Sequence, residues 1–80
     1  MTYSLEVSEE ARVQIDTLPD QVAAALAEVW AFLEITPWAG TARHDRAAVR
    51  QVDFADGTGL VTYLILEDQR IVEILLVLWL

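Results

Sequence analysis

The stretch LVTYLILEDQRIVEILLVLWL, residues 60–80, is the most apolar part of this chain and the best starting point for predicting its fold. Two runs rich in aliphatic and β-branched residues, Leu60–Leu66 and Ile71–Leu80, flank the polar segment Glu67–Arg70. Apolar runs of this length, separated by a short polar turn, are typical of neighbouring buried strands. Ile71–Leu80 is about half the ~20 residues that a membrane helix needs, and Glu73 interrupts it. We therefore expect an antiparallel hairpin and no membrane span.

A further strand is predicted just before this hairpin. Val49–Phe54 alternates, with Val52 and Phe54 on one face, and the following Asp56–Gly59 segment (sequence DGTG) is typical of a turn. The C-terminal half is therefore expected to be a meander of three antiparallel strands. Residues Pro37–Ala48, which precede it, are predicted to be a loop because proline and glycine punctuate them and no apolar period runs through them.

The N-terminal half predicts one strand and two helices. Tyr3, Leu5 and Val7 alternate with polar residues, as in a short strand. Ser8 is a good N-cap for a helix over residues 9–18. A second helix over residues 19–35 carries an apolar stripe at helical spacing, formed by Val22, Leu26, Val29, Trp30 and Leu33. The connection is so short that the two helices should form a hairpin.

The order is strand, helix, helix, strand, strand, strand, over a single domain of residues 1–80. The first strand must join the sheet of the last three, since a lone strand leaves its backbone groups unpaired. We therefore predict an α+β fold of two layers, with the helical hairpin packed on an antiparallel sheet.

Composition narrows the functional classes. The chain of 80 residues has no cysteine, and 13 acidic residues against 5 basic ones give a net charge of −8. This charge disfavours nucleic acid as a partner, because binding to phosphate relies on basic side chains. A hydrophobic share of 55% in so small a chain suggests that some apolar surface meets a partner. With no cysteine and no signal-like N-terminus, we expect a cytoplasmic protein.

Few side chains suggest chemistry. Arg43, His44 and Arg46 cluster in the predicted loop, where His44 could exchange protons near neutral pH. The plainer interpretation is a set of solvated loop residues. Tyr63 is a fourth catalytic candidate, although a tyrosine within a strand is more often a sheet residue. One histidine cannot make a zinc site, and no glycine-rich phosphate loop is present, so no metal or cofactor is expected.

Other side chains are candidates for contacts with a partner. Trp38 follows Pro37 in the predicted loop, and Trp79 and Leu80 end the last apolar run. Tryptophan is enriched where partners make their strongest contacts, and so is arginine. Arg50 at the start of the meander completes this set of candidates.

The order of elements, with these local sequences, resembles the RelE/ParE family of bacterial toxins over nearly the whole chain. The residues that carry the resemblance are Tyr3–Ala11, Leu18-Pro19 with the following helix, Leu33–Gly40, Leu60–Tyr63 and Glu67–Val77. The resemblance implies a small toxin encoded beside an antitoxin that wraps it. RelE-like members cut mRNA on the ribosome, and ParE-like members inhibit DNA gyrase.

One departure from the family bears on activity. RelE-like nucleases commonly carry an arginine a few residues before a strand tyrosine, and alignment on Tyr63 puts Leu60 at that position. A leucine cannot stabilise charge on a scissile phosphate. We therefore expect a toxin-family protein that has no ribonuclease activity and acts by binding protein, with an antitoxin or a second copy of itself as partner. The alternatives are a non-catalytic self-associating domain and a weak mRNA endoribonuclease that uses Arg43, His44 and Arg46.

Overall fold

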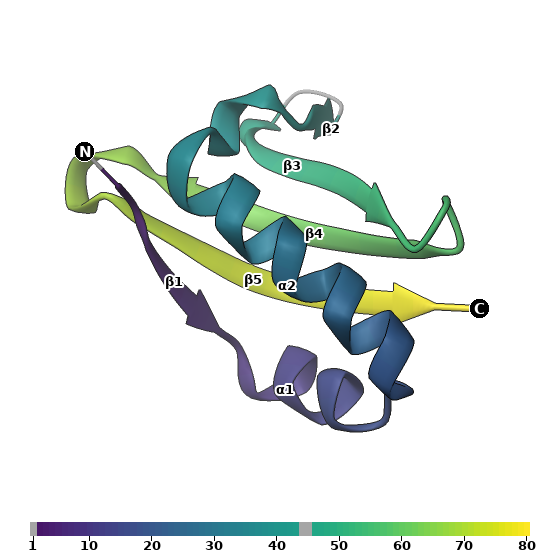
Figure 1. The fold of residues 1–80 in the computed structure, drawn as a ribbon. Coiled ribbons are helices and arrows are strands. Elements are labelled where there is room, and N and C mark those ends of the chain that lie inside the picture. Colours follow the sequence, from purple (N-terminus) through teal and green to yellow (C-terminus); the bar gives the residue numbers. More distant parts are fainter. Residues whose placement is uncertain (1, 44–45) are drawn as a thin grey trace.

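The computed structural model describes residues 2–43 and 46–80, and the side chains of residues 43–47 lie outside that description. Two helices and a five-stranded sheet make up the fold (Figure 1). The elements in chain order are β1 (Ser4–Val7), α1 (Glu9–Asp16), α2 (Asp20–Ile35), a 3-10 turn η1 (Pro37–Ala39), β2 (Thr41–Arg43), β3 (Arg46–Phe54), β4 (Gly59–Leu66), a second 3-10 turn η2 (Glu67–Gln69) and β5 (Ile71–Trp79).

The strand order in the sheet is β1-β5-β4-β3-β2. The last apolar run therefore lies inside the sheet, where β5 pairs antiparallel with β4 and parallel with β1. The register joins Ser4 to Ile71 and Val7 to Ile74. The predicted α+β fold with its order of elements is confirmed, and the parallel β1–β5 pair makes the sheet mixed.

The prediction of a loop over residues 37–48 was wrong. This segment contains η1 and the short edge strand β2, and β3 begins at Arg46 instead of Val49. The described side chains of β2, those of Thr41 and Ala42, are exposed and form no apolar period. Its backbone pairs with β3, and that pairing decides its conformation. A fourth antiparallel strand therefore extends the predicted meander.

Helix α1 protects the outer edge of β5 where β1 stops. The Ser8 hydroxyl oxygen accepts from the Ala11 amide at 3.1 Å as the N-cap, and the Ser8 amide donates to the Ile74 carbonyl at 3.0 Å. One turn later, the Gln14 side-chain carbonyl accepts from the Val77 amide at 2.9 Å. These bonds satisfy backbone groups of β5 that would otherwise face solvent as an unpaired edge.

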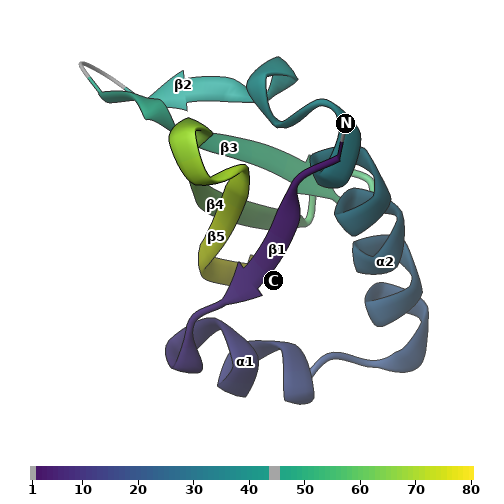
Figure 2. The same ribbon diagram turned by 90° about the vertical axis from the view of Figure 1, so that its left-hand side faces the viewer.

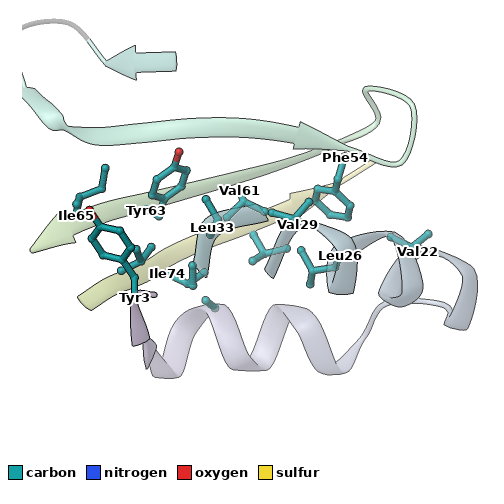
Figure 3. Close-up of a cluster of buried hydrophobic side chains, with 13 residues drawn as sticks. Tyr3, Val22, Leu26, Val29, Leu33, Phe54, Val61, Tyr63, Ile65 and Ile74 are labelled. Atoms are coloured by element: carbon teal, nitrogen blue, oxygen red, sulfur yellow. The ribbon is translucent and has the colours of Figure 1, made fainter. Parts of the chain in front are cut away.

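Helix α2 covers one face of the sheet (Figures 1 and 3). The buried members of its predicted stripe are Val22, Leu26, Val29 and Leu33, whereas Trp30 is only partly buried. They pack against the buried strand residues Phe54, Val61, Tyr63, Ile65, Val72, Ile74 and Val77. Each large aliphatic side chain that is fully buried here contributes about 1.5–3 kcal/mol. This layer is the hydrophobic core.

Gly40, between η1 and β2, leaves room for the buried Tyr63 hydroxyl. A Cβ at this position would overlap that hydroxyl and would lie 3.0 Å from the Gln51 carbonyl oxygen. We expect Gly40→Ala to lower the free energy of unfolding by about 1–3 kcal/mol, as overpacking does elsewhere. Urea denaturation measures the change. The exposed neighbour Thr41→Ala serves as control, and equal midpoints for the two variants would contradict this account.

Candidate functional site

One end of the sheet carries a polar cluster around Glu67. Its Oε1 accepts from the Tyr3 hydroxyl at 2.7 Å and from Trp38 Nε1 at 2.7 Å. Arg70 Nη1 lies 3.4 Å from Glu67 Oε2, and its guanidinium lies 5.1 Å from the centroid of the Tyr3 ring. Glu67 thereby joins the N-terminus, η1 and the β4–β5 connection. These two hydrogen bonds, with Trp38 the larger cause, lower the pKa of Glu67 below its usual 4.5.

Arg50 holds Trp38 from the other side. Its Nη1 donates to the carbonyl oxygens of Trp38 at 2.6 Å and Gly40 at 2.8 Å. Its guanidinium also stacks over the Trp38 ring, 5.1 Å from the centroid. Cation–π contacts of this kind favour a fixed ring position. The structure therefore brings Trp38 and Arg50 together, and Trp38 remains 40% exposed.

Tyr63 serves the fold in this arrangement. Its side chain is fully buried on the α2 face, and its hydroxyl donates to the Pro37 carbonyl at 2.7 Å. Burial is the largest influence on its pKa and raises it, while the nearby Arg50 charge acts in the opposite direction. The hydroxyl ties β4 to η1 and does not meet solvent, so it is not presented to a substrate.

The side chains of the three remaining catalytic candidates lie outside the part of the chain that the structure describes. His44 lies outside the described residues, and so do the side chains of Arg43 and Arg46, whose backbones belong to β2 and β3. Leu60 is placed clearly on β4, opposite Asp53 of β3 and Leu78 of β5. A leucine between a carboxylate and another leucine offers no positive charge to a phosphate group.

Leu60 belongs to the second face of the sheet, which we call the open face. In Figure 2 no helix of the described chain lies over this side of the sheet. The register places three leucines of β4 beside two of β5 on this face, namely Leu60, Leu64, Leu66, Leu76 and Leu78. Acidic groups share it, because Asp53 pairs with Leu60, and Glu73 pairs with both Leu64 and Glu6. The open face is apolar and acidic.

A groove runs between α2 and the outer edge of β3. It holds about 620 Å³, and buried residues of α2 and β3, such as Val22, Val29 and Phe54, form its floor. Glu28 and Asp56 stand on its rim, and Trp79 lines one end. Sequence reasoning missed these acidic residues, because they are far apart in the chain and only the packing of α2 on the sheet brings them together.

The chain end lies beside this groove. Trp79 is 41% exposed and Leu80 is 97% exposed. The Leu80 amide donates to the Thr58 carbonyl at 3.1 Å, which fixes the backbone against the β3–β4 turn. The predicted partner residues therefore form two groups, with Trp38 and Arg50 at the Glu67 cluster and Trp79 with Leu80 near the groove. In the described chain, no helix is long and apolar enough to cross a membrane.

The Glu67 cluster predicts a pH dependence of stability. Because folding lowers the pKa of Glu67, its stabilising effect is present above pH 4.5 and is lost as the pH falls through the folded-state value. We expect Glu67→Gln to lower stability at neutral pH and to flatten the decline of the urea midpoint below pH 4.5. Asp68→Asn, in the same turn and also exposed, is the control. Identical pH profiles for the two variants would refute this role.

Comparison with known proteins gives structural matches alone. No protein-family model matches the sequence, and no curated protein matches it. A structure of the E. coli toxin RelE, a double mutant in the free state, superposes with a TM-score of 0.85 at 15% identity, covering 96% of this chain and 82% of that one. An archaeal RelE–RelB complex from Pyrococcus horikoshii matches with a TM-score of 0.74 at 16% identity, over 99% and 96% of the two chains.

The structure of the toxin–antitoxin complex RelBE2 from Mycobacterium tuberculosis shares more sequence. Its matching chain is 25% identical to this one, with a TM-score of 0.83 and full coverage of both chains. The three matches span bacteria and an archaeon and agree on the whole architecture. The resemblance predicted from the sequence is confirmed, and this chain is a divergent structural relative of the RelE toxins.

Proposed function

We propose that this chain is the toxin of a toxin–antitoxin module and that it acts in the cytoplasm by binding a protein, without cutting RNA. The fold and the 25% identity to a chain of the RelBE2 complex support a RelE-like toxin. The similar structures of RelBE2 and of the archaeal RelE–RelB pair are complexes of toxin with antitoxin, which supports an antitoxin polypeptide as the partner here. The absence of cysteine fits a reducing compartment.

The composition of the open face carries the proposal that RNA is not cut. Cleavage of a phosphodiester needs positive groups aimed at the charge that develops on the phosphate. The open face instead presents leucines, with Asp53 and Glu73 among them. Carboxylates at these places repel phosphate, and the net charge of −8 adds to the repulsion. An apolar sheet face of this kind suits a protein target.

The partner contacts are proposed at the two exposed groups of aromatic and apolar residues. Trp79 and Leu80 are exposed beside the groove, where an antitoxin segment can cover them. Trp38 offers an exposed ring whose position is held by Glu67 and Arg50. Arg50 therefore acts through Trp38, since its guanidinium already binds two backbone carbonyls within the fold.

Expression in bacteria tests the toxin proposal. We expect growth arrest, rescue by the polypeptide encoded next to this gene, and no cleavage of RNA by the purified chain. Leu76→Lys on the open face should relieve the arrest, because it places a charge where an apolar target would dock. Glu10→Lys, an exposed change on α1, is the control that should leave the arrest intact.

Two results would contradict this proposal. Growth without arrest, together with no binding to the neighbouring polypeptide, would remove the toxin assignment. Cleavage of RNA by the wild-type chain that is lost in the His44→Ala/Arg46→Ala double variant would show that the protein is a ribonuclease instead. A denaturation curve should first show that the Leu76→Lys variant is folded. Relief of growth arrest can then be attributed to the changed open face and not to unfolding.

Self-association is the second candidate function, and the leucine rows of the open face favour it. Two copies could bury Leu64 and Leu76 against each other about a two-fold axis. Sedimentation then shows a dimer whose population rises with concentration and which Leu76→Lys disrupts. A monomer at every concentration would exclude this alternative.

A further inference from the structure

A pocket of about 440 Å³ lies at the end of the open face, beside the β3–β4 turn. The turn backbone over residues 57–59 forms one side of it, and the apolar side chains that line it are Leu60, Leu78, Trp79 and Leu80. Asp53 supplies the one charged side chain that lines the pocket in the described chain. An apolar hollow with a single convergent polar group has the composition of a specific binding site.

The register of the sheet explains why a carboxylate stands among leucines here. Asp53 pairs with Leu60, and Leu60 pairs with Leu78, so the three side chains form one row across the open face. The neighbours of Asp53 on β3, Val52 and Phe54, belong to the hydrophobic core on the opposite face. Because side chains alternate along a strand, β3 directs the Asp53 carboxylate away from α2 and onto the open face.

The walls of the pocket are held in place by the fold. The Gly57 amide donates to the Phe54 carbonyl at 3.2 Å, and the Thr58 hydroxyl donates to the Ala55 carbonyl at 2.7 Å. The Leu80 amide then donates to the Thr58 carbonyl at 3.1 Å and joins the end of the chain to this turn. A ligand therefore meets a pocket that is already formed and does not have to order it.

The Asp53 side chain is exposed and makes no contact that would neutralise it. Within residues 2–43 and 46–80, no ion pair or hydrogen bond engages its carboxylate. The arginine side chains that the structure describes lie elsewhere, with Arg50 at η1, Arg70 against Glu67 and Arg12 on α1. The pocket therefore combines apolar walls with an unpaired negative charge. This combination suits a cation on an apolar stem.

The open face continues past Asp53 as a second hollow. It holds about 310 Å³, and residues 39–41 and Gln51 line it. Asp53 and Leu60 line both hollows, so the first opens into the second at this pair of residues. A polypeptide can therefore lie across the sheet while one of its side chains enters the pocket.

Arginine fits this pocket better than the other cations that a partner could bring. Its guanidinium is planar and weakly hydrated, so it pairs with a carboxylate while lying against apolar side chains, whereas the lysine ammonium is strongly hydrated. Trp79, which is 41% exposed, offers a ring for a cation–π contact. A metal ion needs more oxygen ligands than one carboxylate supplies. A second copy of this chain carries the same charge of −8 and would be repelled.

We propose that this pocket binds an arginine side chain of the protein target, with the guanidinium on Asp53 and the methylene stem between Leu60 and Leu78. The inference deepens the proposed function, on which it rests for the target being a protein, by naming a side chain that the open face recognises. The carboxylate that opposes RNA phosphate is then also the group that selects a cationic partner.

Three tripeptides that differ only in their central residue test the inference by NMR titration of the full chain. Acetyl-Leu-Arg-Leu-amide should shift the backbone amides of Asp53, of residues 57–60 and of residues 78–80. The peptide with citrulline keeps the shape of arginine without its charge, and it should bind about fivefold more weakly or worse. The peptide with lysine should bind with an affinity between these two, because it keeps the charge and loses the planar fork.

A pair of variants separates the Asp53 charge from the general acidity of the chain. Asp53→Asn should weaken the arginine peptide by about fivefold or more and leave the citrulline peptide unaffected. Asp56→Asn is the matched control, because it removes an exposed carboxylate from the adjoining turn that does not line the pocket. An arginine peptide that binds no tighter than the other two, equal effects of the two variants, or shifts confined to other residues would overturn the inference.

Growth assays distinguish a failure of this inference from a failure of the proposed function. Asp53→Asn should relieve growth arrest, and Asp56→Asn should leave it intact. Full arrest by Asp53→Asn would refute the recognition of arginine on the target and leave the toxin proposal standing. Arginine-specific binding at Asp53 by a chain that neither arrests growth nor binds the neighbouring polypeptide would refute the toxin proposal alone.

Discussion

The fold is organised around β5, which lies between β1 and β4. β5 is apolar along nearly its whole length, so as an edge strand it would invite pairing with other chains. The parallel partner β1 covers Ile71–Ile74, and α1 takes over at Val77 through Gln14. β1 and α1 together therefore cover the outer edge of β5.

The surfaces that remain accessible follow from this arrangement. α2 covers one face of the sheet, and the opposite face carries leucines and carboxylates. The short β2 covers only part of β3, and the uncovered remainder faces α2 across a groove. Both exposed surfaces combine apolar area with negative charge. Negative charge on these surfaces is unfavourable for contact with RNA phosphate.

The Glu67 cluster shows how polar groups secure one end of the fold. Tyr3 and Trp38 donate to one carboxylate oxygen, and the buried Tyr63 hydroxyl donates to the Pro37 carbonyl. Every buried side-chain nitrogen or oxygen in the described part of the chain has a partner. Tyr63, a catalytic candidate in the sequence, and Arg50, a candidate for partner contacts, therefore both hold η1 against the sheet.

The two helices, the first strand and the last three strands can be predicted from the sequence alone, because alternation and the 3.6-residue period follow directly from which side chains must be buried. The negative charge and the leucine at position 60, on which the argument against RNA cleavage rests, are also properties of the sequence. The conformation of β2 depends on tertiary contacts, since this edge strand is defined by pairing with the backbone of β3. The same holds for the groove, because Glu28 and Asp56 come to stand on one rim only when α2 packs beside β3. Contacts between residues distant in sequence carry no local pattern, and for that reason the structure was needed to find them.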